Sequence, residues 1–269
     1  MKKMTISLII PFYNEQARIA GCLSALTKWI LPSAVKLEQI IFVNDGSTDK
    51  AESRIRNQES GIKKQLHANI TIASYGKNRG KGYAVRHGMS LSRSDYTLFF
   101  DADMSTPLGE LVKFIPAMKK DTDLIVGTRK NGKSTVIVHQ PLYRELLGKV
   151  FTKLTNTILG TTVTDFTCGF KAFSARAKNT ILPGLISDRW GFDAEVIFAA
   201  LYHGMSVTEV PVAWSDERGS KVRLFIDIPR TIKELLAMKL AYGARSIQSA
   251  VPIIRSAYRY AQALSMLVV

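Results

Sequence analysis

Cysteine is scarce in this sequence, and long apolar runs are missing. The 269 residues include two cysteines, Cys22 and Cys168, which are too few for a disulfide framework and lack the spacing of a metal site. A membrane-spanning helix needs about 18 consecutive apolar residues, whereas the last apolar run, Tyr260–Val269, is ten residues long. The run near the N-terminus stops at Pro11, which fits a strand better than a signal peptide. We therefore expect a protein of a reducing compartment with no spanning helix.

Acidic residues are also under-represented, with 22 against 37 basic residues and a net charge of +15. Such a balance favours nucleic acid, an anionic membrane surface or phosphorylated ligands as partners. No known nucleic-acid-binding motif and no platform of interleaved aromatic residues accompanies the charge. The charge therefore points first to membranes and phosphorylated ligands. It leaves a non-catalytic, basic nucleotide-binding or nucleic-acid-binding protein as an alternative.

Strand and helix patterns alternate along the first half of the chain. Strands are expected at residues 6–10, 39–43, 70–74, 96–100 and 124–126. A helix is expected over 16–30, with one apolar stripe formed by Ile19, Leu23, Leu26 and Ile30. This alternation predicts an α/β fold with a mostly parallel sheet and helices on both of its faces.

The second half is less regular, and the character of its sequence changes after Lys221. Helices are expected at 141–159 and 192–203, and further strands at 170–173 and 207–214. The segment after that mixes apolar residues with arginine and lysine, in two or three helices that either pack on the core or lie at a membrane interface. Because of the net charge, we expect one domain over residues 1–223 and membrane-associating amphipathic helices over residues 224–269.

Two carboxylates follow the apolar strand at Tyr96–Phe100. Asp101 and Asp103 stand one residue apart at its C-terminal end. Open α/β sheets bind ligands outside the carboxyl ends of their strands, and two hard oxygen donors there suit Mg²⁺ or Mn²⁺ carrying a substrate diphosphate. The alternative is an acidic loop that precedes a helix, with Thr106 as its N-cap and Pro107 at its first position.

The first two strands also end in polar residues, in the sequences PFYNE at 11–15 and NDGSTD at 44–49. If these ends lie side by side, a nucleoside can lie between them. Asp45 can accept the imide N–H of uracil, and Glu15 can accept a ribose hydroxyl. The alternative for the second sequence is a turn whose hydroxyl groups cap the next helix.

A basic, glycine-rich segment follows at residues 78–86, with the sequence NRGKGYAVR. Gly80 and Gly82 flank Lys81 at an expected helix start. Backbone N–H groups and the positive end of a helix dipole suit a phosphate or a ribose edge. The segment lacks the Walker A pattern, so an ATPase P-loop is not indicated.

Taken together, the sequences IIPFYNE, VNDGSTD, NRGKGYAVR and FFDADMSTP resemble the family 2 glycosyltransferases, which have the Rossmann-like GT-A fold. The resemblance covers about residues 4–240. The later segments are similar to polyprenyl-phosphate sugar transferases, and to the dolichyl-phosphate β-glucosyltransferases more than to mannosyl enzymes. These segments are GTR at 127–129, TDFTCGFKAF at 164–173, RWGFDAE at 189–195 and VPVAWSDERGSK at 210–221.

The resemblance implies roles for particular residues. Those expected to bind the nucleotide are Pro11, Tyr13, Glu15, Asp45, Lys81, Asp101, Ala102 and Asp103. Those expected to act in catalysis are Asp103, Arg129, Arg218 and Lys221. Those expected to contact the acceptor or the sugar are Arg144, Asp165, Trp190, Asp193, Glu195 and Ser220. Asp101 and Asp103 would hold Mg²⁺ or Mn²⁺. Ser105 stands where the mannosyl enzymes often have glutamine, which leaves the third protein ligand open.

The implied reaction is transfer of glucose from UDP-glucose to a polyprenyl phosphate of the dolichyl type, at the cytoplasmic face of a membrane. A phosphate monoester has a second pKa of about 6, so it is a dianion near neutral pH and can attack the sugar without an enzymic base. Alignment and neutralisation of leaving-group charge then supply catalysis, and in-line attack inverts the anomeric centre. Asp193 and Glu195 are the alternative bases, and a mannosyl or other sugar transferase using the same lipid is the alternative enzyme.

Overall fold

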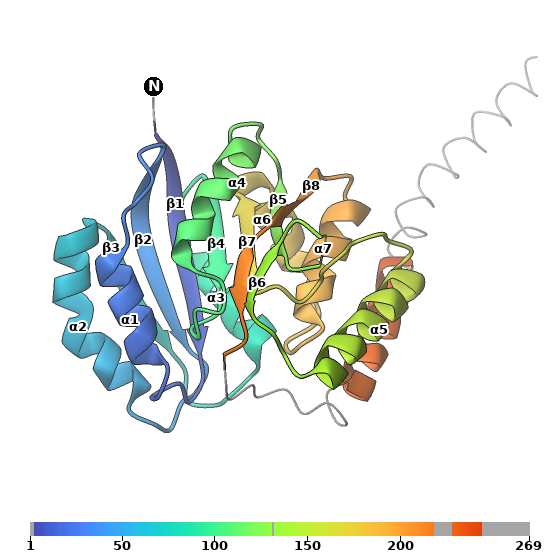
Figure 1. The fold of residues 1–269 in the computed structure, drawn as a ribbon, viewed down its shortest axis with the longest axis horizontal. Helices are drawn as coiled ribbons and strands as arrows, with labels where there is room; N and C mark the ends of the chain where they lie inside the picture. The colour runs from blue at the N-terminus through green and yellow to red at the C-terminus, as the bar shows by residue number, and fades with distance from the viewer. Residues whose placement is uncertain (1–2, 131, 218–227, 244–269) are drawn as a thin grey trace, which may run out of the picture.

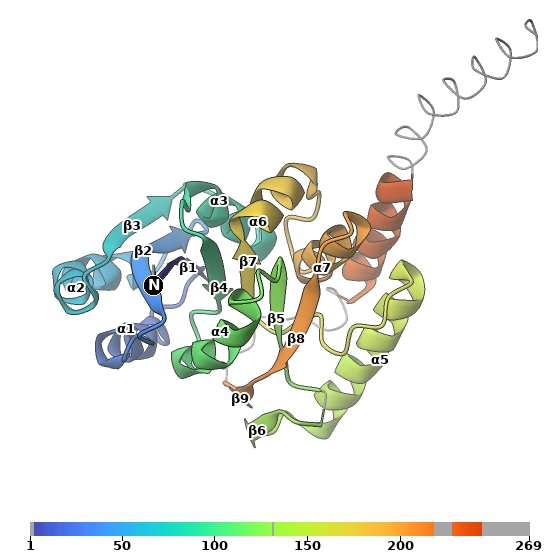
Figure 2. The ribbon, with the colours of Figure 1, turned by 90° about the horizontal axis from the view of Figure 1, so that it is seen from above.

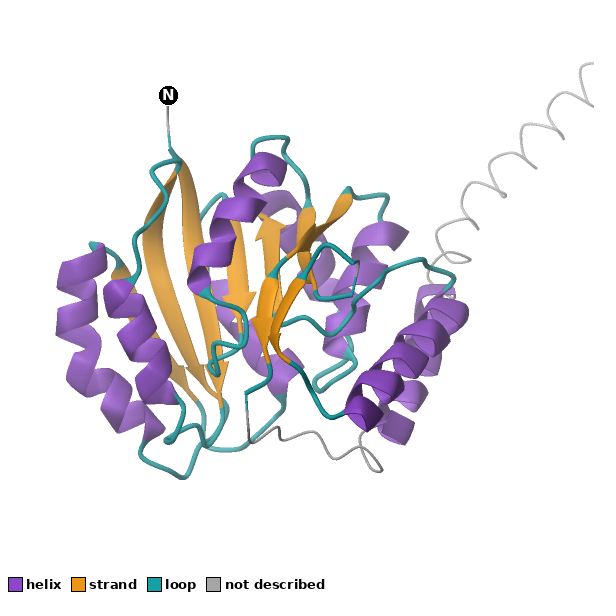
Figure 3. Cartoon of the chain, in the orientation of Figure 1, coloured by secondary structure: helices purple, strands orange, loops and turns teal. Residues whose placement is uncertain are grey.

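The computed structural model describes residues 3–130, 132–217 and 228–243. A seven-stranded sheet runs through the centre of the molecule, in the strand order β3-β2-β1-β4-β7-β5-β8 (Figures 1 and 3). Its strands are β1 (Met4–Phe12), β2 (Val35–Asn44), β3 (Asn69–Ser74), β4 (Tyr96–Phe100), β5 (Leu124–Thr128), β7 (Phe170–Ser174) and β8 (Val207–Pro211). The predicted α/β sheet is confirmed.

All neighbouring strands are parallel except where β7 is involved, because β7 runs antiparallel to both β4 and β5. Six strands therefore end at one edge of the sheet, and β7 begins there. The segment that leads into β7 is thus brought beside the end of β4. A separate two-stranded parallel sheet pairs β6 (Thr135–Val138) with β9 (Ala213–Ser215) near the same edge.

Helices cover both faces of the main sheet (Figure 2). One face packs against α1 (Ile19–Lys28), α2 (Ala51–Leu66) and α4 (Leu111–Met118), which follows the short 3-10 helix η1 (Leu108–Glu110). The other face packs against α3 (Lys81–Leu91), α6 (Ala175–Ile181) and α7 (Phe192–Tyr202), with the 3-10 helix η2 (Leu182–Gly184) after α6.

The central strands read as unbroken apolar runs because both of their faces are covered. In β1, for example, Leu8 and Ile10 belong to the core on one face and Ile9 to the core on the other, as the alternation of side chains along a strand requires.

Two local expectations from the sequence were wrong. Ile30 is 89% exposed rather than part of the helical stripe, because α1 ends at Lys28 and the stripe stops at Leu26. The strand expected over 207–214 is two strands, and Val212 between them lies in the core while the chain passes from the main sheet to the small one.

The helix over 228–243 is attached to the core. Leu235, Met238 and Tyr242 form a buried stripe on one face, and the ring of Tyr242 lies edge-on to Phe198 and Tyr202 of α7. The stripe repeats at the spacing of one helical face. This part of the C-terminal segment therefore has the core-packing role, while membrane association of residues 224–269 stays a prediction, and residues 224–227 and 244–269 lie outside the described residues.

This packing predicts different effects for two adjacent leucines. Leu235→Ala should lower the free energy of unfolding by about 3 kcal/mol, because it removes a fully buried side chain and leaves a cavity. Leu236→Ala, at a position that is 49% exposed, should change it by less than about 0.5 kcal/mol. Urea unfolding of the full-length variants measures both values. Equal effects would mean that this helix does not pack on the core in solution.

Candidate active site

A cavity of about 1200 Å³ lies at the edge of the sheet where β1, β2, β4 and β5 end. It is lined by most of the residues that the sequence singled out, namely Pro11, Tyr13, Glu15, Asp45, Lys81, Asp101, Ala102, Asp103, Arg129, Arg144, Trp190 and Asp193. Asp165 and Glu195 do not belong to its lining and are fully buried. Arg218, Ser220 and Lys221 lie outside the described residues, so their roles stay predictions.

Asp101 is set against the backbone of the segment that enters β7. Its N–H donates to the carbonyl of Gly169 at 3.2 Å, and a Cβ at Gly169 would lie 1.8 Å from Oδ2 of Asp101. Only glycine leaves room for this carboxylate, which is the kind of close approach that glycine permits. Burial raises the pKa of Asp101 above its ordinary value, although Lys81, 2.9 Å away, opposes the rise.

Asp103 is oriented from two sides. Its Oδ1 accepts hydrogen bonds from the N–H of Ser105 at 3.0 Å and from the hydroxyl of Ser105 at 2.8 Å. Its Oδ2 lies 3.7 Å from Arg18, which also makes a bidentate ion pair with Glu15. Ser105 therefore orients Asp103 in this structure.

The two carboxylates suit a divalent cation. Mg²⁺ is usually bound by one or two protein carboxylates together with substrate phosphates, and Asp101 and Asp103 supply hard oxygen donors in one loop beside the cavity. The described ranges contain no cluster of three or more histidine, cysteine, aspartate or glutamate side chains that could hold a metal alone. The donor set thus fits a cation that is shared with a phosphorylated substrate.

Asp45 fastens the glycine-rich segment before α3. Its carboxylate accepts hydrogen bonds from the hydroxyl of Tyr75, the side chain of Asn78 and the backbone N–H groups of Arg79 and Gly80. Gly80 has φ +110°, a backbone conformation that favours glycine. Asp45 therefore shapes the wall of the cavity, and its contact with a uracil base stays a prediction.

Arg129 is held in place by Asp165. The guanidinium donates to both oxygens of Asp165, at 2.7 and 2.9 Å, and lies 5.0 Å above the ring of Trp214. Burial would raise the pKa of Asp165, but Arg129 outweighs burial and lowers it well below the ordinary value. Asp165 thus lies behind Arg129, and Arg129 is the member of the pair that lines the cavity.

Asp193 and Glu195 are bound within the protein. Asp193 accepts from Lys171 at 2.5 Å and from Lys81 at 3.2 Å. Burial would raise its pKa, but the two lysines lower it below the ordinary value. The two oxygens of Glu195 accept from the backbone N–H groups of Ile186 and Ser187, so this side chain holds the loop before α7. Each oxygen of both carboxylates already accepts a hydrogen bond from the protein.

Sequence reasoning missed three charged residues of this region, Arg18, Lys130 and Lys171. Arg18 stands three residues after Glu15, which is the spacing of a pair on one helical turn. Lys130 donates to the carbonyl of Gly148 and the hydroxyl of Thr152, and so ties β5 to α5 (Leu142–Leu159). Lys171 stands in an otherwise apolar strand. Because a lysine is almost never fully buried unless it is paired, its position in such a strand indicates a charged partner.

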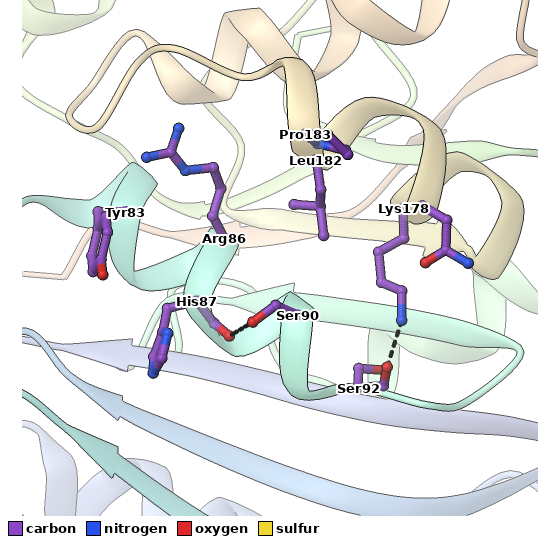
Figure 4. A pocket seen from close by; sticks show the side chains of 9 residues that line it. Tyr83, Arg86, His87, Ser90, Ser92, Lys178, Leu182 and Pro183 are labelled. Carbon is purple, nitrogen blue, oxygen red and sulfur yellow. Dashed lines mark hydrogen bonds between the residues drawn. The ribbon is translucent and has the colours of Figure 1, made fainter.

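A second cavity, of about 580 Å³, lies between α3 and the segment of α6 and η2 (Figure 4). Its basic groups have partners within the protein. Lys178 donates to the carbonyl of Ser92, and Arg86 donates to the carbonyl of Leu185 and pairs with Asp188. Among the described residues, the carboxylates that could carry chemistry gather at the first cavity.

The family model of Glycosyl transferase family 2 matches residues 7–182. Dolichyl-phosphate beta-glucosyltransferase of Dictyostelium discoideum is 30% identical over 246 residues, which are 88% of this chain and 74% of that protein. The enzyme of the same name from Saccharomyces cerevisiae is 30% identical over 253 residues, which are 90% of this chain and 76% of that protein. The human one is 28% identical over 249 residues, 88% of this chain and 75% of that protein.

Solved structures share the fold. Glucosyl-3-phosphoglycerate synthase from Mycobacterium tuberculosis in complex with UDP matches with a TM-score of 0.65 at 18% identity, over 88% of this chain and 80% of that chain. The same synthase with Mn²⁺ and UDP-glucose matches with a TM-score of 0.64 at 17% identity, over 88% and 79% of the two chains. The expected GT-A fold is thereby confirmed.

The Arg129–Asp165 pair predicts a pH-dependent contribution to stability. Because the pKa of Asp165 is lowered on folding, its stabilisation is complete above the ordinary value of 3.8 and is lost as the pH falls below it. Asp165→Asn should cost about 3 kcal/mol at pH 7, since it leaves Arg129 buried without its partner, and the difference from wild type should shrink below pH 4. Asp121→Asn, at an exposed loop position, should change stability by less than about 0.5 kcal/mol. Urea unfolding between pH 3 and pH 7 checks this, and a difference independent of pH would contradict it.

Proposed function

This chain belongs to Glycosyl transferase family 2, and on that premise we propose that it transfers glucose from UDP-glucose to a polyprenyl phosphate, with inversion at the anomeric carbon. The enzyme class is shown by the family match. The observation that carries the substrates is the 30% identity, over about nine-tenths of the chain, to dolichyl-phosphate beta-glucosyltransferases. A cavity of about 1200 Å³ at the carboxyl edge of the sheet is large enough for a sugar nucleotide together with a lipid headgroup.

The donor lies across the ends of β1, β2 and β4. Tyr13, Glu15 and the segment that Asp45 holds form the nucleoside end of the cavity. Asp101 and Asp103 face the diphosphate. A divalent cation bound there, Mg²⁺ or Mn²⁺, would neutralise the charge that develops on the leaving diphosphate.

The acceptor phosphate lies on the side of Arg129 and Arg144, which line the cavity with Lys130. These basic side chains attract a phosphate dianion and align it with the anomeric carbon. A phosphate dianion needs no enzymic base to attack. This role for the acceptor agrees with the state of Asp193, because two lysines bind its oxygens and lower its pKa, which makes it a weak base near neutral pH.

A lipid acceptor requires the protein to lie on a membrane, and we extend the proposal to peripheral association. None of the helices in the described ranges has the length and apolar character of a membrane span. However, α5 exposes an apolar stripe beside the cavity, whose members are Leu142, Tyr143, Leu146 and Val150. Lys149 and Lys153 stand three residues after Leu146 and Val150, and so lie on the same side of the helix as the stripe. Exposed apolar side chains next to basic ones are typical of interfacial helices.

The helix over 228–243 adds Leu236 and Leu240 to the exposed apolar surface, while its other face is buried in the core. The part of the chain after residue 243 was predicted from sequence to bind membranes, and it lies outside the described residues. In this proposal α5 and the exposed side of 228–243 meet the lipid headgroups together with that segment, at the cytoplasmic face of the membrane.

Transfer is tested with purified full-length protein, Mn²⁺ or Mg²⁺, a panel of sugar nucleotides and a short polyprenyl phosphate, with the product identified by mass spectrometry. We expect glucose transfer from UDP-glucose. Asp103→Asn should lower kcat about 100-fold, because it removes a charged oxygen ligand of the divalent cation that would neutralise the leaving diphosphate. Asp121→Asn serves as the control and should leave kcat unchanged. Preferential use of GDP-mannose would indicate a mannosyl enzyme, and UDP binding without transfer from any donor would indicate a binding module.

Membrane contact through α5 is tested by co-sedimentation with anionic liposomes. Leu146→Glu combined with Val150→Glu should weaken binding of the full-length protein about tenfold or more, because two apolar side chains that enter the interface are replaced by charges that anionic lipids repel. The matched control is Ile30→Glu combined with Val112→Glu, at positions that are 89% and 55% exposed on other helices or loops. An equal loss in both double variants would show that charge, rather than the α5 face, decides binding.

A further inference from the structure

One lysine lies at the centre of the sheet, where the reaction described above gives it no contact with a substrate. Lys171 belongs to β7, between β4 and β5, and its side chain is 0% exposed. Its strand neighbours Phe170 and Phe173 are core residues. A buried charge is costly unless it is paired, and a central strand normally carries apolar residues at such positions. The position therefore calls for a physical reason.

The partners of Lys171 lead step by step to the cavity. Its Nζ lies 2.5 Å from Oδ1 of Asp193 and donates to the carbonyl of Cys168 at 2.8 Å. The other oxygen of Asp193 lies 3.2 Å from Nζ of Lys81. Lys81 in turn lies 2.9 Å from Oδ1 of Asp101. These four side chains, Lys171, Asp193, Lys81 and Asp101, form a charge chain of alternating sign and zero net charge.

Stability alone does not explain the charge chain. Apolar residues of similar volume often stabilise a fold as well as a buried ion pair does, or better. Both lysines lie close to the ring of Phe99, with Nζ atoms 5.3 and 5.5 Å from its centroid, so apolar surroundings are available there. Asp193, Lys81 and Asp101 line the cavity, whereas Lys171 does not. Lys171 can thus act on a ligand only through the other three.

We propose that Lys171 is a positioning residue for the sugar-nucleotide donor. It balances Asp193, so that Lys81 is shared between Asp193 and Asp101. Without the charge of Lys171, Asp193 attracts Lys81 away from Asp101, and the remaining chain carries a net charge of −1 beside the diphosphate. The inference rests on the proposed function, because it places the donor diphosphate next to Asp101.

The test is a double-mutant cycle on nucleotide affinity, measured by calorimetry with UDP and Mn²⁺ on the full-length protein. Lys171→Met should weaken UDP binding about tenfold, while the KM for the lipid acceptor changes less than about twofold. Lys171→Arg keeps the charge and should recover part of the affinity. In a Lys81→Met background, Lys171→Met should add less than about twofold, because the route through Lys81 is already gone. Wild-type affinity in Lys171→Met, or the same loss in both backgrounds, would overturn the proposal.

A control separates positioning from folding. If Lys171→Met does not fold, Lys171→Met combined with Asp193→Leu replaces the buried pair by apolar side chains, a change that buried pairs often tolerate. The double variant should keep its thermal unfolding midpoint and bind UDP within about twofold of wild type, because the charge that would attract Lys81 away from Asp101 is removed together with Lys171. A folded double variant that still binds UDP about tenfold more weakly contradicts the proposal, because no unbalanced Asp193 remains to cause the loss. A wild-type protein that does not bind UDP contradicts this inference and the proposed function together. Glucose transfer by wild type with unchanged UDP binding in Lys171→Met contradicts this inference alone.

Discussion

The site depends on balancing the carboxylates that gather at one edge of the sheet. Asp45, Asp101 and Asp193 line the cavity and Asp165 lies behind Arg129, and a buried carboxylate without partners would not stay ionised. Three kinds of partner hold these four carboxylates. Backbone N–H groups hold Asp45, Arg129 holds Asp165, and lysines hold Asp101 and Asp193. The shape of the cavity follows, because these partners also fix the loops that form its wall.

The sheet was predictable because its signals are local. A strand covered on both faces is an unbroken apolar run, and its polar end marks the carboxyl edge, as at Phe100 and Asp101. The antiparallel insertion of β7 between β4 and β5 was not predictable in this way, because strand pairing is a long-range property that the local pattern does not carry. That insertion places Gly169 beside Asp101, and it places Lys171 beside Asp193. The part of the topology that was not predicted therefore shapes the site.

The sequence also predicts which residue types form the site, but it does not predict the direction in which each side chain points. Asp165 and Glu195 were expected at the acceptor or the sugar, and the structure turns both inward, one onto Arg129 and the other onto the N–H groups before α7. A sequence shows that a carboxylate is present and not which donor reaches it first. For Lys171 the opposite holds. The sequence shows it only as one letter of the motif TDFTCGFKAF, and its complete burial in the structure shows that it needs a counter-charge.

In the proposed reaction the acceptor phosphate attacks unaided, since Asp193 and Glu195, the two candidate bases, are already bound by the protein. The most direct measurement is the pH dependence of kcat/KM for the acceptor, with a polyprenyl phosphate and with the matching phosphonate, whose second pKa is higher. We expect the acidic limb to follow the acceptor, near pH 6 for the phosphate and at higher pH for the phosphonate. A limb at the same pH for both acceptors would assign the ionisation to a base of the protein, and would contradict the claim.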